Sequence, residues 1–189
     1  MKVTKIFILL AVFLSASLNG SDRFFLNLTA NGVLPFDSGY KDLYGKIQLS
    51  PDVKLGWEPF KGVFLWTRYG LAYGKGIIPM LGDETKCIQH FLSAGIGLRI
   101  RFSDRIDWTV YVGWCDILYR EESMGLSFAD SAFGITDGSD IRFYLRRKCF
   151  VSLSVSYIYA KTFAHPTQSE SVQINPGGLR FGAGIGFTF

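Results

Sequence analysis

Apolar and polar residues alternate along the chain after Arg23, and eight runs keep this alternation. The last run, 178–189, reads GLRFGAGIGFTF, with apolar residues at odd positions and glycine, arginine or threonine at even positions. A period of two is typical of a β-strand whose two faces meet different surroundings. The other runs occupy residues 23–34, 45–57, 62–74, 90–102, 105–115, 139–147 and 150–160. The pattern therefore predicts an all-β protein.

The connections between these runs alternate in length. Three are short, with the sequences EPFKG, SD and RKC, and the others are long loops, with no helical stretch of note. In an up-and-down antiparallel sheet, this alternation places every short turn at one end and every long loop at the other. Both chain ends then join the end with the short turns.

Charge indicates which face of the strands points inward. The polar faces carry Asp52, Lys54, Arg68, Arg99, Arg101, Asp107, Asp140, Arg142 and Arg180. The apolar faces end in aromatic residues, with Phe24, Trp57, Phe102, Trp108, Phe187 and Phe189 toward the short turns and Tyr73, Trp114, Tyr119 and Tyr159 toward the long loops. Two aromatic rings are typical of the two interfaces of a membrane. This favours an apolar face turned to lipid over the alternative, a soluble lipocalin-like barrel with an apolar cavity.

A sheet in lipid has to be closed, because each unpaired backbone group in hydrocarbon costs several kcal/mol. The last run must then pair with the first. The predicted fold is a closed antiparallel up-and-down eight-stranded transmembrane β-barrel.

The first twenty residues resemble a secretory signal. Lys2 and Lys5 precede a short apolar run, and small and polar residues follow it. We predict a cleaved signal peptide at 1–20 and an outer-membrane β-barrel domain at 21–189. Loss of the two lysines leaves 18 basic residues of 20 against 16 acidic ones, a balance that gives no support to nucleic-acid binding.

Cysteine and histidine suggest no metal or cofactor chemistry. The cysteines Cys87, Cys115 and Cys149 are an odd number without a C-x-x-C spacing, and we expect neither a disulfide nor a metal site. No cofactor is predicted.

The pattern as a whole resembles the small eight-stranded outer-membrane proteins of diderm bacteria, the class of the OmpA transmembrane domain and OmpX. The C-terminal run carries the most specific part of the resemblance. It implies an assembly signal formed by Phe181, Ile185, Phe187 and Phe189 and read by the barrel-assembly machinery. It also implies a location in the cell outer membrane, in contact with outer-membrane lipid.

The polar face of such a barrel has two interpretations. The charged residues listed above form either a packed plug of ion pairs or the lining of a narrow, anion-preferring pore. The first interpretation predicts a non-enzymatic protein that acts in surface interaction or envelope integrity through four extracellular loops, with a host or surface ligand as candidate partner. The alternative is a narrow channel for small or hydrophobic solutes.

A third hypothesis is a hydrolase similar to the lipid A deacylases. His165 and Thr167 have the H-x-S spacing of that group, with Thr in place of Ser and Pro166 between them. These departures lead us to predict that the protein is not an enzyme. The apolar stretch 77–81 in a long loop is expected to fold into the barrel mouth or to contact a host molecule or lipid.

Overall fold

A computed structural model describes residues 23–77, 82–123, 125–167, 170–174 and 176–189, and leaves out the side chains of residues 123, 126, 161–167 and 170–174. The predicted signal peptide, residues 1–20, lies outside this part of the chain. The described elements are β1 (Phe24–Pro35), α2 (Ser38–Tyr44), β2 (Gln48–Phe60), β3 (Val63–Ile77), β4 (Glu84–Arg101), β5 (Ile106–Ser123), β6 (Leu126–Arg146), β7 (Cys149–Thr167), β8 (Glu170–Ile174) and β9 (Gly178–Thr188).

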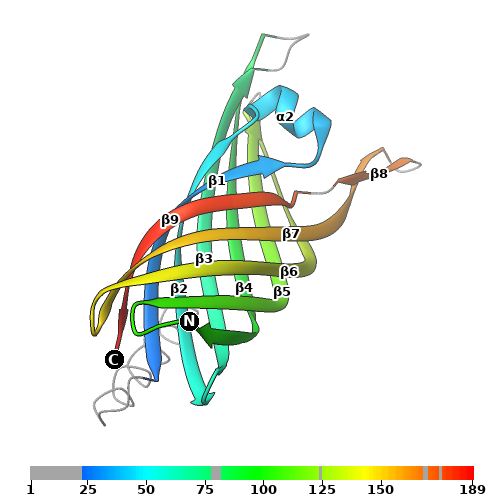
Figure 1. Ribbon diagram of the computed structural model, residues 1–189. Coiled ribbons are helices and arrows are strands. Elements are labelled where there is room, and N and C mark those ends of the chain that lie inside the picture. The colour runs from blue at the N-terminus through cyan, green and yellow to red at the C-terminus, as the bar shows by residue number, and fades with distance from the viewer. Residues whose placement is uncertain (1–22, 78–81, 124, 168–169, 175) are drawn as a thin grey trace, which may run out of the picture.

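The strands close into a barrel. Each strand from β1 to β7 pairs antiparallel with the next one, and β9 pairs with both β7 and β1 (Figure 1). β8 pairs only with the outer part of β7, so that eight strands form the wall. The predicted fold is confirmed. Within the described residues, no helix is long and apolar enough to span a membrane.

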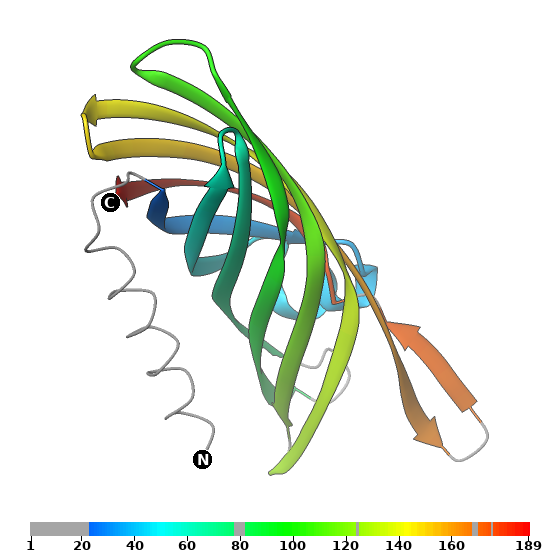
Figure 2. The same ribbon diagram turned by 90° about the horizontal axis from the view of Figure 1, so that it is seen from below.

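The two ends of the barrel differ as the connection lengths predict. The short turns β2–β3, β4–β5 and β6–β7 lie at one end together with both ends of the barrel domain, at the lower left of Figure 1. There the backbone N–H of Phe24 donates to the carbonyl of Phe189 at 3.0 Å. The hairpins β5–β6 and β7–β8 project from the opposite end (Figure 2).

Side chains alternate between the wall's two faces. Outward positions such as Leu65, Leu98 and Ile185 are about half exposed, whereas their inward neighbours are buried. Tyr119 was predicted to lie in the outer aromatic ring, and this is wrong: only 8% of it is exposed. The odd positions of β5 face inward from Asp107 onward, and Tyr119 follows the same alternation.

Segments predicted as loops contain regular structure. The stretch 119–138 is not a loop, because β5 and β6 stay paired as far as Ser123 and Leu126. Backbone hydrogen bonds stabilise this hairpin, and they do not depend on which side chains it carries. Polar residues there interrupt the alternation of apolar and polar residues by which strands are recognised in a sequence. The β7–β8 hairpin likewise replaces part of the last long loop.

The first long loop contains α2, which the sequence analysis did not predict. Asp37 caps the helix by accepting a hydrogen bond from the backbone N–H of Tyr40 at 2.9 Å, and Gly45 ends it at a φ of 93°. Two turns are too short to show a helical period in the sequence, which explains the omission.

β2 and β3 separate early. Their pairing stops at Asp52 opposite Gly70, although both strands continue toward the long-loop end. The backbone N–H of Glu58 donates to the carbonyl of Arg23, the residue before β1. N–H groups of successive strand residues point to opposite sides, so odd residues of β2 point theirs at β3. Pro51 is the next odd position, and it has no N–H to donate to Leu71. Proline therefore ends the ladder at this point.

α2 packs at this separation. Gly76 of β3 lies so close to the helix that a Cβ at this position would collide with the backbone oxygen of Leu43. The helix therefore contacts β3 directly, beside the part of β2 that β3 no longer pairs with.

We predict that Pro51→Thr extends the β2–β3 ladder by restoring the missing donor. Amide hydrogen exchange should show the new N–H at position 51 protected together with that of Leu71. Rapid exchange at both amides would show that something other than proline separates the strands. Pro59→Thr, near the short-turn end of β2, is the matched control and should leave the exchange of Leu71 unchanged.

Candidate functional site

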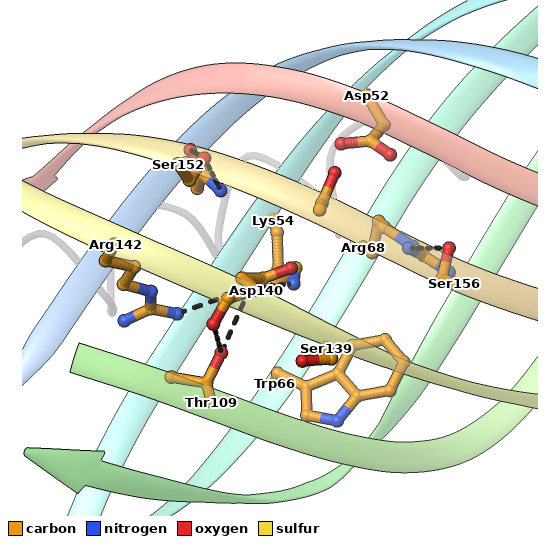
Figure 3. Close-up of polar contacts among 12 residues, drawn as sticks. Asp52, Lys54, Trp66, Arg68, Thr109, Ser139, Asp140, Arg142, Ser152 and Ser156 are labelled. Atoms are coloured by element: carbon orange, nitrogen blue, oxygen red, sulfur yellow. Dashed lines mark hydrogen bonds and ion pairs between the residues drawn. The ribbon is translucent and has the colours of Figure 1, made fainter.

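The middle of the barrel contains a buried ionic cluster around Asp140 of β6. The ammonium of Lys54 lies 2.6 Å from Asp140 Oδ2, and the Thr109 hydroxyl donates to the same oxygen at 3.2 Å. Arg142 Nη2 lies 3.7 Å from it, and these side chains are buried (Figure 3). β2, β5 and β6 thus direct two cations and a hydroxyl at one carboxylate, which offsets the cost of burying the charges.

A second cluster surrounds Asp52 of β2. Arg180 Nη2 lies 3.2 Å from Asp52 Oδ2 and donates to the Ser50 hydroxyl at 2.7 Å. The Asn31 amide donates to the same Asp52 oxygen at 2.8 Å. Arg68, on the neighbouring strand, is held by neutral acceptors instead: it donates to Ser156 at 3.2 Å (Figure 3) and to Thr136 at 3.1 Å.

Aromatic rings fill the lumen on the side of the short turns. The buried cluster consists of Phe25, Phe64, Trp66, Tyr111 and Phe150, with Tyr144 packed against it. The Arg142 guanidinium lies 3.9 Å from the centre of the Phe25 ring, and the Lys54 ammonium 3.8 Å from that of Tyr111. Arg142 has no hydrogen-bond partner among the described residues, so Asp140 and ring faces are what stabilise its charge.

Strand glycines make room for these rings. A Cβ on Gly97 would overlap the Phe64 ring, and a Cβ on Gly186 would overlap Phe150. The structure shows that at these two positions glycine accommodates phenylalanine.

An apolar cluster fills the lumen on the side of the long loops. Its members are Ala72, Phe91, Cys115, Ile117, Ala132, Ile158 and Ala160. The Arg180 guanidinium lies 5.0 Å from the centre of the Phe91 ring, which places this cluster directly beside the second ionic cluster. The two ionic clusters therefore lie between an aromatic layer, into which Arg142 extends, and an apolar layer.

The mouth at the short turns is lined with charged groups. Arg99 bonds to the carboxylate of Glu58, donates to Asp107 at 2.7 Å and donates to the Tyr144 hydroxyl at 3.3 Å. Arg101 was grouped with the interior residues, but its side chain is 62% exposed, and its Nε lies 3.4 Å from Asp107. β4 ends at Arg101, and the side chain extends from the rim toward solvent.

The mouth at the long loops is covered by α2. The Tyr44 hydroxyl donates to Glu121 at 2.6 Å and lies 3.0 Å from the Thr85 hydroxyl. Burial, followed by the hydrogen bond to Glu121, raises the pKa of Tyr44 above its usual range. The contact between Tyr44 and Glu121 could not be predicted from the sequence, because only the packing of α2 against the barrel brings the two residues together.

The proposed assembly signal lies on the outer face of β9. Phe181, Ile185 and Phe187 are about half exposed there, and the Phe189 ring stacks on Phe24 with 6.3 Å between centroids. The side chains of His165 and Thr167 lie outside the described residues, as do residues 78–81 of the apolar loop stretch. Among the described residues, no group of three or more His, Cys, Asp or Glu side chains could hold a metal ion.

No family model and no curated protein sequence matches the chain. Its fold, in contrast, matches many solved structures. The outer membrane protein OprG of Pseudomonas aeruginosa has a TM-score of 0.71 at 11% identity, covering 88% of this chain and 96% of OprG. Neisserial surface protein A has a TM-score of 0.61 at 13% identity, covering 89% of this chain and 98% of that protein. Ail of Yersinia pestis, the attachment invasion locus protein, has a TM-score of 0.53 at 16% identity, covering 87% of this chain and 97% of Ail.

These similarities concern the fold, since all of the identities are low. The chain has the architecture of the small eight-stranded outer-membrane β-barrels, the class that the sequence pattern and the C-terminal strand resemble.

We predict that Asp140→Asn destabilises the barrel by about 3–5 kcal/mol, because it leaves the two cations Lys54 and Arg142 buried beside a neutral group. Urea unfolding in lipid vesicles, followed by tryptophan fluorescence, measures the change. Asp104→Asn, an exposed residue of the β4–β5 turn, is the control and should have little effect. Equal stability of the Asp140 and Asp104 variants would contradict the role of the ionic cluster.

Proposed function

We propose that the protein is an integral outer-membrane protein, non-enzymatic, that acts in surface interaction or envelope integrity through the end with the long loops. The main support is the filled lumen, in which ion pairs lie between an aromatic and an apolar layer. An eight-stranded barrel is just wide enough for its own side chains, and here they occupy it. Solute transfer along the axis would have to displace these layers.

The outer face supports the location in a membrane. Large apolar side chains remain exposed on every barrel strand, and such a belt is unfavourable in water but is solvated by lipid. Stacked rings of Phe24 on Trp57 and Phe102 on Trp108 lie at the short-turn end, at the level expected for one membrane interface. The short turns and both ends of the barrel domain then face the periplasm.

The projecting hairpins are the surface that we assign to interaction. β6 pairs with β7 only from Phe133 onward, so residues 126–132 are supported by β5 alone and extend beyond the wall. Phe128 is half exposed on this hairpin. Exposed apolar residues on a rigid hairpin are suited to contact with another molecule. Ail, which has the same fold, has been solved with the heparin analogue sucrose octasulfate.

We expect cells that display the protein to adhere to epithelial monolayers or heparin-coated surfaces, and Phe128→Ser to abolish adhesion, because it removes the exposed ring of the β5–β6 hairpin. This change retains Glu121, the partner of Tyr44. The refolded wild-type barrel, verified by heat-modifiable gel migration, should give no unitary steps in a planar bilayer.

Lys148→Ala in the β6–β7 turn serves as the control, since it alters the opposite end and should leave adhesion intact. Adhesion no better than that of vector-only cells, or stable conductance steps, would refute the proposal.

A second candidate function, passage of hydrophobic solutes through the wall, is favoured by the separation of β2 and β3. Beyond Asp52 and Gly70 the two strands no longer pair, and Leu49 on the outer face there is largely exposed. An opening at this height would connect the long-loop mouth with the membrane without crossing the packed lumen. α2 lies against it and would have to move.

For this second function we expect vesicles containing the barrel to take up an apolar fluorescent compound faster than empty vesicles. Pro51→Thr, by extending the ladder, should slow uptake to the empty-vesicle rate, while Pro59→Thr should not. Uptake that is the same with and without protein would exclude the lateral route.

A further inference from the structure

The short-turn end of the barrel contains a recess of about 500 Å³ that the functions above do not use. Five cations line it: Arg23, Lys61, Arg99, Arg101 and Arg147. They come from the residue before β1, from the end of β4 and from the β2–β3 and β6–β7 turns, which only closure of the barrel brings together.

The recess has an excess of positive charge. Glu58 and Asp104 are the acidic groups in its lining, so that five cations face two acids. Arg99 is neutralised locally by Glu58 and Asp107. Lys61 and Arg147 are exposed and have no ion pair among the described residues, and Arg101 keeps only a long contact with Asp107. These three charges are available to a ligand.

The floor of the recess is closed. Tyr144 lines it, and Tyr144 packs against the aromatic cluster that contains Phe64 and Phe150. Arg142 lies within that cluster and contributes another positive charge beneath the floor. A blind concave site with an excess of one sign of charge and low-dielectric walls focuses the field on whatever enters it. The geometry is therefore that of a binding site and not that of a pore entrance.

We propose that this recess binds the phosphate groups of an anionic ligand. Clustered Arg and Lys side chains are the usual partners of phosphate, and the volume is within the range of small-molecule sites. Two sources share this chemistry: the headgroup of an anionic phospholipid in the adjacent leaflet, and a soluble phosphate compound of the periplasm. The choice of these sources rests on the proposed membrane orientation.

The test is calorimetric titration of pyrophosphate into the folded barrel in zwitterionic detergent. A parallel native mass measurement follows lipid retained from phosphatidylcholine nanodiscs with and without phosphatidylglycerol. The variant Lys61→Gln/Arg101→Gln/Arg147→Gln should weaken binding about tenfold, equivalent to about 1.4 kcal/mol. Added salt should also weaken it.

The matched control is Lys46→Gln/Lys75→Gln/Lys86→Gln, which removes the same charge from exposed residues at the opposite end and should leave binding unchanged. Retention of phosphatidylglycerol without pyrophosphate binding identifies a lipid headgroup, and the reverse identifies a soluble phosphate. No binding of either probe, or equal loss in both triple variants, overturns the proposal. Because binding is measured in detergent, failure of the protein to reach the outer membrane would refute only the proposed function.

Discussion

Closure of the backbone hydrogen-bond ring is the constraint on which the rest of the structure depends. A strand edge in hydrocarbon would leave each N–H and C=O group unpaired, and β9 removes both edges by pairing with β1 and β7. Closing eight strands fixes a lumen about as wide as its own side chains. Inward positions must then fill that space, and outward positions must be apolar. The polar interior thus follows from the closed sheet.

The interior combines ionic and apolar packing in layers. Asp140 and Asp52 each hold cations, and rings of Phe25 and Phe91 cover the faces of Arg142 and Arg180. Removal of water from this layer strengthens each charge pair but makes any unpaired charge costly. The layering therefore explains how so many buried charges are compatible with a stable barrel. It also leaves the surfaces at the two ends, and not the lumen between them, accessible to other molecules.

The two mouths have different chemistry for local reasons. At the short-turn end, two turns and the end of β4 carry Lys61, Arg147 and Arg101 around a blind recess. At the long-loop end, Pro51 ends the β2–β3 ladder and α2 packs against β3. The helix lies beside the separated strands and brings Tyr44 to Glu121. The second candidate function, passage of hydrophobic solutes through the wall, depends on this local departure from a regular barrel.

The sequence by itself determined the strand number, the inward and outward faces and the order of short and long connections, because strand alternation is local and has a period of two. Only the tertiary structure revealed the long β5–β6 hairpin and α2, since backbone pairing and a two-turn helix leave no clear periodic pattern. Tyr119 was misplaced where the alternation was not followed to the end of β5. Which cations share Asp140, and which turns form the basic recess, depends on strand register and barrel closure. Both bring together residues far apart in the chain, and no local pattern encodes them.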